Sequence, residues 1–199
     1  MPVPPPVLFV HGIWDTGRIF DAMVERLRAR GFVHLHALDL SPPDASVPLA
    51  EYGRQVDVAA RDLLAKSGAA RLDIVGFSMG TLAARWWLVK RGGRELARRF
   101  VSIAGPQHGT WTAFFNWLPG AVDMRPGSEF LRELASDPAG FGGVEVISMW
   151  TPMDLMIIPA SSGVLPGSEE QKFRVPLHGL MPSDARVIDA VAEALLRAD

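Results

Sequence analysis

The order of apolar and polar positions divides the chain into alternating strand-like and helix-like segments. Short apolar runs rich in β-branched residues predict strands, and longer stretches with apolar residues three and four apart predict helices. The strands are expected at residues 7–10, 32–40, 72–75, 100–104, 144–150 and 173–175. The helices are expected at residues 19–30, 47–66, 81–90, 129–135 and 183–196.

This alternation predicts the fold class. Strands that follow one another through helices must run parallel, and their helices cover both faces of the sheet. The chain has no internal repeat or low-complexity linker, so we expect one α/β domain over residues 1–199. Its sheet should be mostly parallel, with about six strands. Ligands bind beyond the carboxyl ends of the strands in such sheets.

One stretch at such an edge carries recognisable chemistry. Gly76-Phe77-Ser78-Met79-Gly80 follows an apolar strand and precedes a helix-forming run, which is the G-x-S-x-G pattern. An abrupt turn from strand to helix crowds the backbone, so the positions two before and two after the corner must lack a Cβ. The hydroxyl of Ser78 would stand above the positive end of the helix. The alternative reading is an ordinary turn with a solvated serine.

A nucleophilic serine needs a base within hydrogen-bond reach and a third group that orients the base. In this type of fold the three follow the chain order nucleophile, acid, histidine. His178 follows the last expected strand and precedes the terminal helix, so it is the candidate base, with a solvated loop histidine as the alternative. His34 and His36 fit packing or surface positions. His108 would leave no room for an acid.

Three aspartates, Asp123, Asp137 and Asp154, lie between Ser78 and His178. Asp137 precedes a proline and fits turn chemistry, and Asp123 lies in a loop bounded by glycine and proline. Asp154 follows a strand inside an apolar run, where an unpartnered carboxylate would be costly. It is therefore the candidate acid, with a cap of the turn at residues 151–152 as the alternative.

An acyl carbonyl attacked by Ser78 would become an oxyanion that needs two hydrogen-bond donors. The backbone N–H of Met79 is one candidate, and the other comes from the loop after the first strand. In that loop we expect the N–H of Ile13 to be the second donor, with Trp14 as the less favoured choice. We expect His11 to fix the loop through its ring nitrogens.

Aromatic residues are concentrated after the fourth expected strand, at residues 111–118. This segment could wall an acyl pocket or form a small flap, and a core-packing excursion is an equal alternative. The candidate substrate-binding residues are Trp14, Phe77, Trp111, Phe114, Phe115 and Trp117.

Composition narrows the function classes. With 199 residues, 48% of them hydrophobic, the chain can bury a sizeable core. Lys and Arg number 20 against 22 Asp and Glu, and no basic cluster indicates a nucleic-acid groove; the basic stretch 91–99 is expected to face water. Cysteine is absent, which excludes disulfides and thiolate metal sites. Neither a signal peptide nor a bilayer-spanning segment is recognised, so a cytoplasmic protein is expected.

Four motifs together carry a family resemblance: Val-His-Gly-Ile after the first strand, Asp-Ile-Val-Gly-Phe-Ser-Met-Gly at the corner, Asp-Leu-Met-Ile-Ile, and His-Gly-Leu-Met. The chain resembles the α/β-hydrolase superfamily, and in particular small bacterial triacylglycerol lipases without a large lid domain. The resemblance implies Ser78 as nucleophile, Asp154 and His178 as its partners, and the N–H groups of Ile13 and Met79 as oxyanion hole. It also implies carboxylic ester hydrolysis without cofactor or metal.

Two features depart from those lipases. Phe77 and Thr81 stand where the lipases usually carry a histidine and a glycine, which leaves the pocket shape open, and the segment 105–143 is longer than compact members need.

The main hypothesis is hydrolysis of a small-molecule or lipid ester. Thioester or amide hydrolysis and acyl transfer would use the same residues. A binding protein without turnover, and a lipase acting at a membrane surface, are further hypotheses. The sequence does not determine the acyl length or the oligomeric state.

Overall fold

The computed structural model describes residues 4–137 and 140–198. The strands are β1 (Val7–Val10), β2 (Leu35–Leu38), β3 (Leu72–Phe77), β4 (Ala97–Ile103), β5 (Glu145–Trp150) and β6 (Glu169–Lys172). The α-helices are α1 (Asp21–Ala29), α2 (Leu49–Ser67), α3 (Met79–Lys90), α4 (Gly93–Leu96), α5 (Pro119–Asp123), α6 (Glu129–Ala135) and α7 (Ala185–Leu196). Short 3₁₀ helices are η1 (Gly17–Phe20), η2 (Trp111–Phe115), η3 (Ala160–Gly163) and η4 (His178–Leu180).

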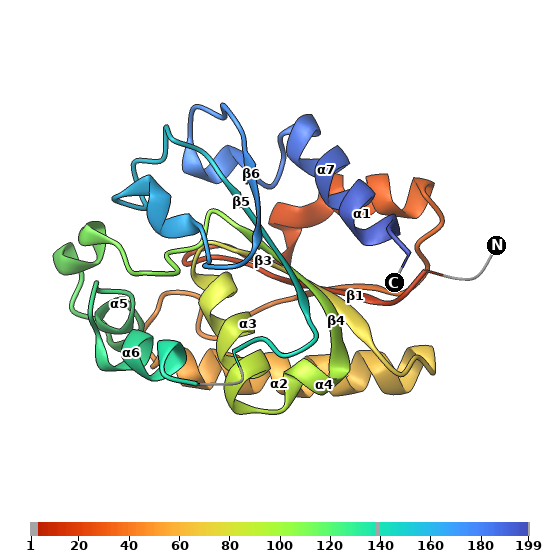
Figure 1. The fold of residues 1–199 in the computed structure, drawn as a ribbon, viewed down its shortest axis with the longest axis horizontal. Coiled ribbons are helices and arrows are strands. Elements are labelled where there is room, and N and C mark those ends of the chain that lie inside the picture. Colours follow the sequence, from red (N-terminus) through yellow and green to blue (C-terminus); the bar gives the residue numbers. More distant parts are fainter. Residues whose placement is uncertain (1–3, 138–139, 199) are drawn as a thin grey trace.

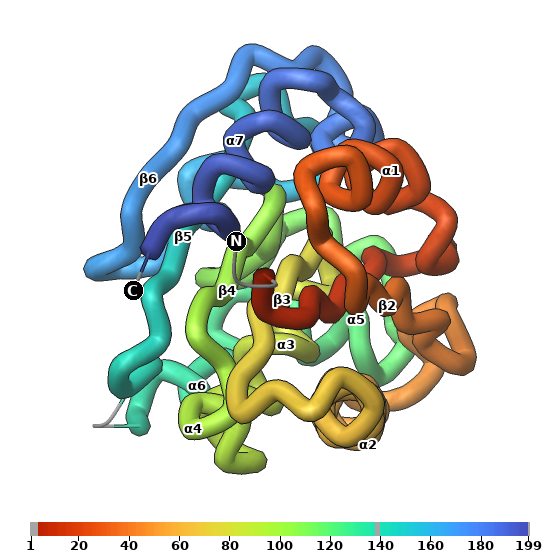
Figure 2. The backbone as a smooth tube through the Cα atoms, turned by 90° about the vertical axis from the view of Figure 1, so that its right-hand side faces the viewer, coloured from red at the N-terminus to blue at the C-terminus, as the bar shows by residue number. Residues whose placement is uncertain are grey.

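Within the described residues, six strands form one sheet in the order β2-β1-β3-β4-β5-β6, and each pair of neighbours is parallel (Figure 1). This confirms the fold class predicted from the alternating pattern. Because β2 lies on one side of β1 and β3 on the other, the connections through α1 and α2 cover opposite faces. Figure 2 shows α1 and α7 side by side across the sheet from α2 and α3.

The sheet separates two hydrophobic cores. Along β1, Val7 and Phe9 pack into the core that α1 and α7 cover, whereas Leu8 and Val10 pack into the core under α2 and α3. All four side chains are buried. A strand covered on both faces reads as a continuous apolar run rather than an alternating one, which is why β1 is easily found in the sequence.

The edge strands differ most from their predicted bounds. β2 is shorter than 32–40 because both ends bond elsewhere: the Phe32 N–H donates to the Leu27 carbonyl, 3.1 Å away, and the Leu40 N–H donates to His11. The prediction of a strand at 173–175 was wrong, since β6 ends at Lys172. β6 reads Glu-Glu-Gln-Lys and is largely exposed at the sheet edge, so it carries no apolar signal.

Helix bounds differ by a few residues. The segment predicted as one helix at 19–30 begins with the 3₁₀ turn η1 before α1, and α3 begins at Met79, directly after the corner serine. The carboxylate of Asp123 accepts the Leu49 N–H at the start of α2, at 2.8 Å. That contact, between residues far apart in sequence, fixes where α2 begins.

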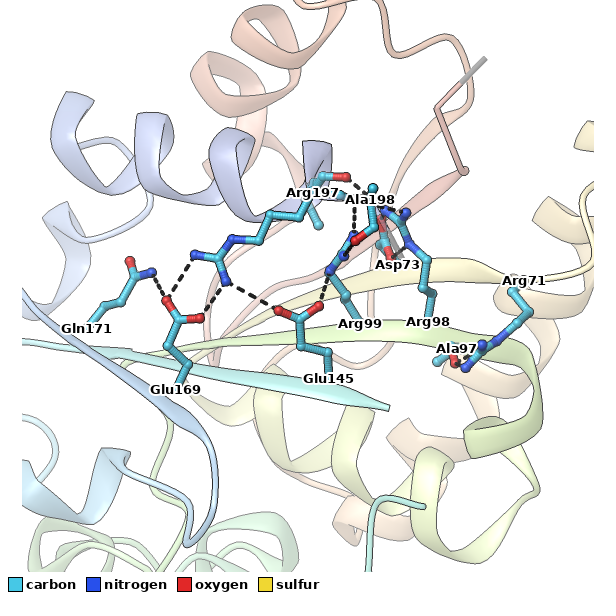
Figure 3. A network of polar contacts seen from close by, with 11 residues as sticks. Arg71, Asp73, Ala97, Arg98, Arg99, Glu145, Glu169, Gln171, Arg197 and Ala198 are labelled. Atoms are coloured by element: carbon cyan, nitrogen blue, oxygen red, sulfur yellow. Dashed lines mark hydrogen bonds and ion pairs between the residues drawn. The ribbon is translucent and has the colours of Figure 1, made fainter. Parts of the chain in front are cut away.

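Charged side chains gather at the amino ends of the strands (Figure 3). Arg98 is paired with Asp73 at 2.6 Å, Arg99 with Glu145, and Arg197 with both Glu145 and Glu169. Arg99 is 2% exposed, so the prediction that the stretch 91–99 faces water was wrong at this position. The network ties the end of α7 to the sheet, because Arg99 also donates to the Arg197 carbonyl, 2.9 Å away.

No helix within the described part of the chain combines the length and the apolar character needed to cross a bilayer.

Candidate active site

Ser78 lies at the corner between β3 and α3, in a strained backbone conformation. Its φ of 51° and ψ of −125° are unusual for a residue with a side chain and are typical of functional corners. The Ser78 N–H donates to the Ile103 carbonyl at 2.9 Å. The Ser78 carbonyl accepts from both the N–H and the hydroxyl of Thr81, at 3.1 and 2.7 Å. These bonds hold the corner on both sides.

The glycine spacing around Ser78 is a packing requirement, as the pattern predicted. A Cβ at Gly76 would lie 2.8 Å from the Thr81 Cα, and one at Gly80 would lie 2.2 Å from the Val10 carbonyl oxygen. Thr81 is fully buried and fills the space beside Gly105, where a Cβ would lie 2.1 Å from its hydroxyl. Thr81 stands where the lipases usually carry a glycine. Because it is buried, this difference affects the packing beneath the corner and not the lining of the cavity next to Ser78.

Asp154 and His178 are hydrogen-bonded to each other. The His178 Nδ1 lies 2.7 Å from the Asp154 Oδ2, and both side chains are largely buried. A carboxylate that accepts this bond selects the tautomer with the proton on Nδ1, in which Nε2 of a neutral imidazole is an acceptor. The other oxygen, Oδ1, accepts the N–H groups of Met156 and Ile157, each at 2.9 Å. Asp154 therefore orients the imidazole and also caps the turn that follows it.

Phe77, which directly precedes Ser78, packs against the imidazole of His178. The ring of Phe77 is buried against the His178 ring, with centroids 4.9 Å apart. The carboxyl of Asp15, in the loop after β1, also lies near the imidazole. Burial raises the pKa of Asp15, and the nearby His11 and His178 oppose that rise. Asp154 and His178 thus lie beside the corner that carries Ser78, whereas no hydrogen bond joins the Ser78 hydroxyl to the His178 ring within the part of the chain that the structure describes.

The other acid and base candidates have different partners. Asp123 bonds the start of α2, and Asp137 forms an ion pair with Arg94 at 3.0 Å. The His108 ring nitrogen bonds the Val164 carbonyl at 3.0 Å. His36 is an exposed residue of the edge strand β2.

The loop after β1 packs directly against Ser78. A Cβ on Gly12 would lie 2.9 Å from the Ser78 Cβ and 3.4 Å from its Oγ. His11 is fully buried beneath the loop: its Nε2 accepts the Leu40 N–H at 2.8 Å, and its Nδ1 bonds the Gly12 carbonyl at 2.7 Å. The prediction that both ring nitrogens fix this loop is confirmed.

The two candidate donors of that loop differ in their hydrogen bonds. The Trp14 N–H donates to the Pro43 carbonyl, 2.6 Å away, so it is not free for an oxyanion. Among the residues that the structure describes, the Ile13 N–H donates to no acceptor. Met79 is the first residue of α3, where an N–H has no intrahelical acceptor.

A small apolar cavity of about 90 Å³ opens beside Ser78. Its lining consists of Ile13, Trp14, Ser78, Thr110, Thr112, Ala113, Asn116, Ala121, Met124, Met156 and Ile157. Of the predicted substrate-binding residues, only Trp14 belongs to this lining. Sequence reasoning missed the small and polar positions of the aromatic segment, although their alternation with exposed aromatic residues is a signal that could have identified them.

The remaining aromatic candidates lie outside the cavity. Phe77 is under the imidazole, and the side chains of Trp111, Phe114, Phe115 and Trp117 are exposed. These four large side chains are therefore neither part of the buried core nor part of this cavity's lining, whereas Ala113 between them packs into the core. Their contact with a substrate stays a prediction. The small residues between them face the cavity and leave the large rings outside.

No set of three or more His, Asp or Glu side chains within residues 4–137 and 140–198 is arranged to hold a metal ion.

The fold is shared with several solved structures. The mature lipase BlEst2 of Bacillus licheniformis superposes with a TM-score of 0.84 and 14% identity, over 98% of this chain and 93% of that one. Lipase B of Aspergillus fumigatus superposes with a TM-score of 0.79 and 16% identity, over 98% of this chain and 53% of that one. A monoacylglycerol lipase of Paleococcus ferrophilus superposes with a TM-score of 0.71 and 14% identity, over 97% of this chain and 96% of that one.

At these identities the likeness is one of fold. No curated protein matches this chain in sequence. The sequence profile of the alpha/beta hydrolase family matches residues 7–197, and this chain belongs to that family.

Proposed function

We propose that this chain is a serine hydrolase that cleaves carboxylic esters through an acyl-serine intermediate. The proposal rests above all on the 2.7 Å bond between His178 Nδ1 and Asp154 Oδ2, beside the corner that carries Ser78. A histidine held by a carboxylate in this way has the tautomer that a general base needs. The cavity next to Ser78 offers apolar walls for an acyl chain.

In the first step, the Ser78 Oγ attacks the carbonyl carbon of the ester and its proton moves to the His178 Nε2. The carbonyl oxygen becomes an oxyanion, which the N–H groups of Ile13 and Met79 stabilise. The carbon–oxygen bond to the alcohol then breaks, and the imidazolium gives its proton to the departing oxygen. The acyl group stays on Ser78.

In the second step, water attacks the acyl-serine while His178 takes one of its protons. A second tetrahedral intermediate uses the same two N–H donors. Its collapse releases the carboxylic acid and returns the proton to the Ser78 oxygen. No cofactor enters this sequence, because the acid, the base and the donors all belong to the chain.

Hydrolysis of p-nitrophenyl butyrate, a short ester suited to a small cavity, tests the proposal. Ser78→Ala should lower kcat/KM by at least about 10³-fold, because the nucleophile is lost. Ser136→Ala, which changes an exposed serine at the end of α6, is the matched control and should retain the rate of the unchanged chain. Equal rates for the Ser78→Ala variant and the unchanged chain would refute the proposal.

A fluorophosphonate ester separates turnover from nucleophile activation. The unchanged chain should be labelled covalently and Ser78→Ala should not, as read by intact-mass spectrometry. Labelling without hydrolysis of any oxygen ester would indicate a thioester, an amide or an acyl acceptor as the natural substrate. Absence of both labelling and turnover would favour a binding protein.

A further inference from the structure

Several large apolar side chains in the loops at the carboxyl ends of the strands are exposed to solvent. Phe115 is 91% exposed, Trp117 81%, Leu155 72% and Trp14 65%. Together with them, Trp111 and Leu177 are more than half exposed. We call these six residues the apolar rim. A role in lining the cavity does not explain why these side chains are exposed, because Trp14 alone among the six belongs to that lining.

The apolar rim comes from several loops that the fold brings to one end. Each rim residue either lines the cavity or adjoins a site residue in sequence: Leu155 follows Asp154, Leu177 precedes His178, and Phe115 precedes Asn116. These loops lie at the end of the sheet opposite the two termini (Figure 1). The exposed apolar side chains of the rim therefore belong to the same loops that carry the cavity lining and the candidate site residues.

Hydrogen bonds hold the rim in this outward arrangement. The hydroxyls of Thr110 and Thr112 both donate to the Met156 carbonyl, at 2.8 and 2.6 Å, and the Trp111 N–H donates to the Ile158 carbonyl at 2.9 Å. These bonds join the aromatic segment to the loop that follows Asp154. The rings therefore protrude from a fixed backbone.

Arg125 supports the aromatic segment from the side. Its guanidinium lies 5.0 Å from the Phe114 ring centroid and 4.7 Å from that of Trp117, and it donates to the Asn116 carbonyl at 3.0 Å. A cation that stacks on two rings restrains their orientation. The positive charge of Arg125 is thereby engaged with the segment itself.

The apolar rim carries little charge, which limits the kind of partner it fits. Residues 109–122 and 155–168 contain no Asp, Glu, Lys or Arg. The ion pairs of the sheet lie instead at the amino ends of the strands (Figure 3). An anionic membrane would need a basic surface, which this rim lacks.

We infer that the apolar rim docks the chain onto an uncharged lipid–water interface. The inference rests on the proposed function, because it explains how an ester would reach Ser78. Indole rings favour such interfaces, where one side is apolar and the other is wet. A folded protein seated on the rim would close the cavity, whereas a fluid lipid layer can supply the ester through the same opening.

Binding to vesicles of zwitterionic phosphatidylcholine tests this inference. The experiment uses Ser78→Ala in the full chain, so that binding is measured without turnover and independently of the proposed reaction. Co-sedimentation should show binding that changes little between low and high salt, since it is not electrostatic. Adding Phe115→Ser and Trp117→Ser should weaken the partition coefficient at least about tenfold, because two large apolar groups are lost.

The matched control places Val33→Ser and Val58→Ser in the same background. These valines are 65% and 70% exposed but lie away from the rim, so vesicle binding should not change. Thermal unfolding of each variant verifies that it is folded. The inference is overturned by absence of binding to phosphatidylcholine, by equal losses in both double variants, or by binding that requires anionic lipid and disappears in salt. Rim-dependent dimers in sedimentation velocity without vesicle binding would identify a second copy as the occupant instead.

Discussion

At the scale of single residues, Asp154 combines two tasks that the sequence could present only as alternatives. One carboxylate oxygen accepts from the His178 ring, and the other accepts the N–H groups of Met156 and Ile157. The turn therefore fixes the carboxylate, and the carboxylate fixes the imidazole. A buried carboxylate with all these donors is satisfied, which is why the apolar run around it tolerates the charge.

Asp154→Asn separates these two tasks. The amide oxygen can still accept the N–H groups of Met156 and Ile157, so the melting temperature should change little. The amide nitrogen is a donor, however, and would force the proton of His178 onto Nε2, where it cannot act as base. We expect kcat for p-nitrophenyl butyrate to fall by about 10³- to 10⁴-fold at neutral pH.

Asp154→Ala is the comparison for that variant. It should lose activity and also about 1–3 kcal/mol of stability, because the N–H groups of the turn lose their acceptor. Near-normal turnover by Asp154→Asn would mean that Asp154 serves the turn alone.

At the scale of elements, the site is built where the strand order reverses. β1 lies between β2 and β3, so the loop after β1 and the corner after β3 emerge next to each other. Open parallel sheets bind their ligands at this position. The contact is so close that position 12 has no room for a side chain beside Ser78.

Gly12→Ala tests this contact between elements. Its Cβ would lie 2.9 Å from the Ser78 Cβ, so either the loop carrying the Ile13 N–H or the serine must shift. We expect kcat/KM for p-nitrophenyl butyrate to fall at least about tenfold, since a misplaced donor loses much of its effect on the transition state.

Gly143→Ala is the matched control for that change. Nothing lies within 4 Å of a Cβ built there, and its rate should be unchanged. Full activity in Gly12→Ala would show that the loop after β1 does not determine the oxyanion site.

At the scale of the whole molecule, the two ends of the sheet have opposite characters. The carboxyl ends of the strands carry the cavity and the apolar rim, whereas the amino ends carry ion pairs that join β4, β5, β6 and the end of α7. This separation places the ion-pair network away from the candidate site. It also gives the opposite end a dependence on pH.

The pair of Glu169 and Arg197 makes that dependence measurable. The hydrogen bond that the Glu169 carboxylate accepts from Arg197 lowers the pKa of Glu169 from 4.5 to about 2. A carboxyl whose folded pKa lies below its unfolded pKa stabilises the fold above the unfolded value. That stability is lost as the pH falls from about 4.5 to about 2. Since the side chain is 40% exposed, the contribution should be at most about 1 kcal/mol.

Denaturant unfolding over that pH range tests the pair. The loss of unfolding free energy on acidification should be smaller in Glu169→Gln than in the unchanged chain, and high salt should reduce the difference. Glu95→Gln, at an exposed position in α4, is the control and should follow the unchanged chain. Identical pH curves for all three proteins would show that the pair contributes nothing.

The sequence by itself determined the parts of this protein that local patterns encode. β1, β3 and β4 are buried on both faces and read as apolar runs, and the spacing of Gly76, Ser78 and Gly80 follows from crowding within one turn. His178 and Asp154 could be selected because the chain order of the three residues and the cost of an unpaired carboxylate leave few choices.

Only the tertiary structure decided which surfaces these elements share. β6 is polar at the sheet edge and was misplaced, because its pairing with β5 leaves no periodic signal. The Trp14 N–H was a possible donor until the fold brought the Pro43 carbonyl to it. The aromatic segment could be core, pocket or surface, since hydrophobicity fixes a preference for burial but not the partner that provides it. Which surface buries an apolar segment depends on distances between residues in the folded chain, and the order of residues alone does not give those distances.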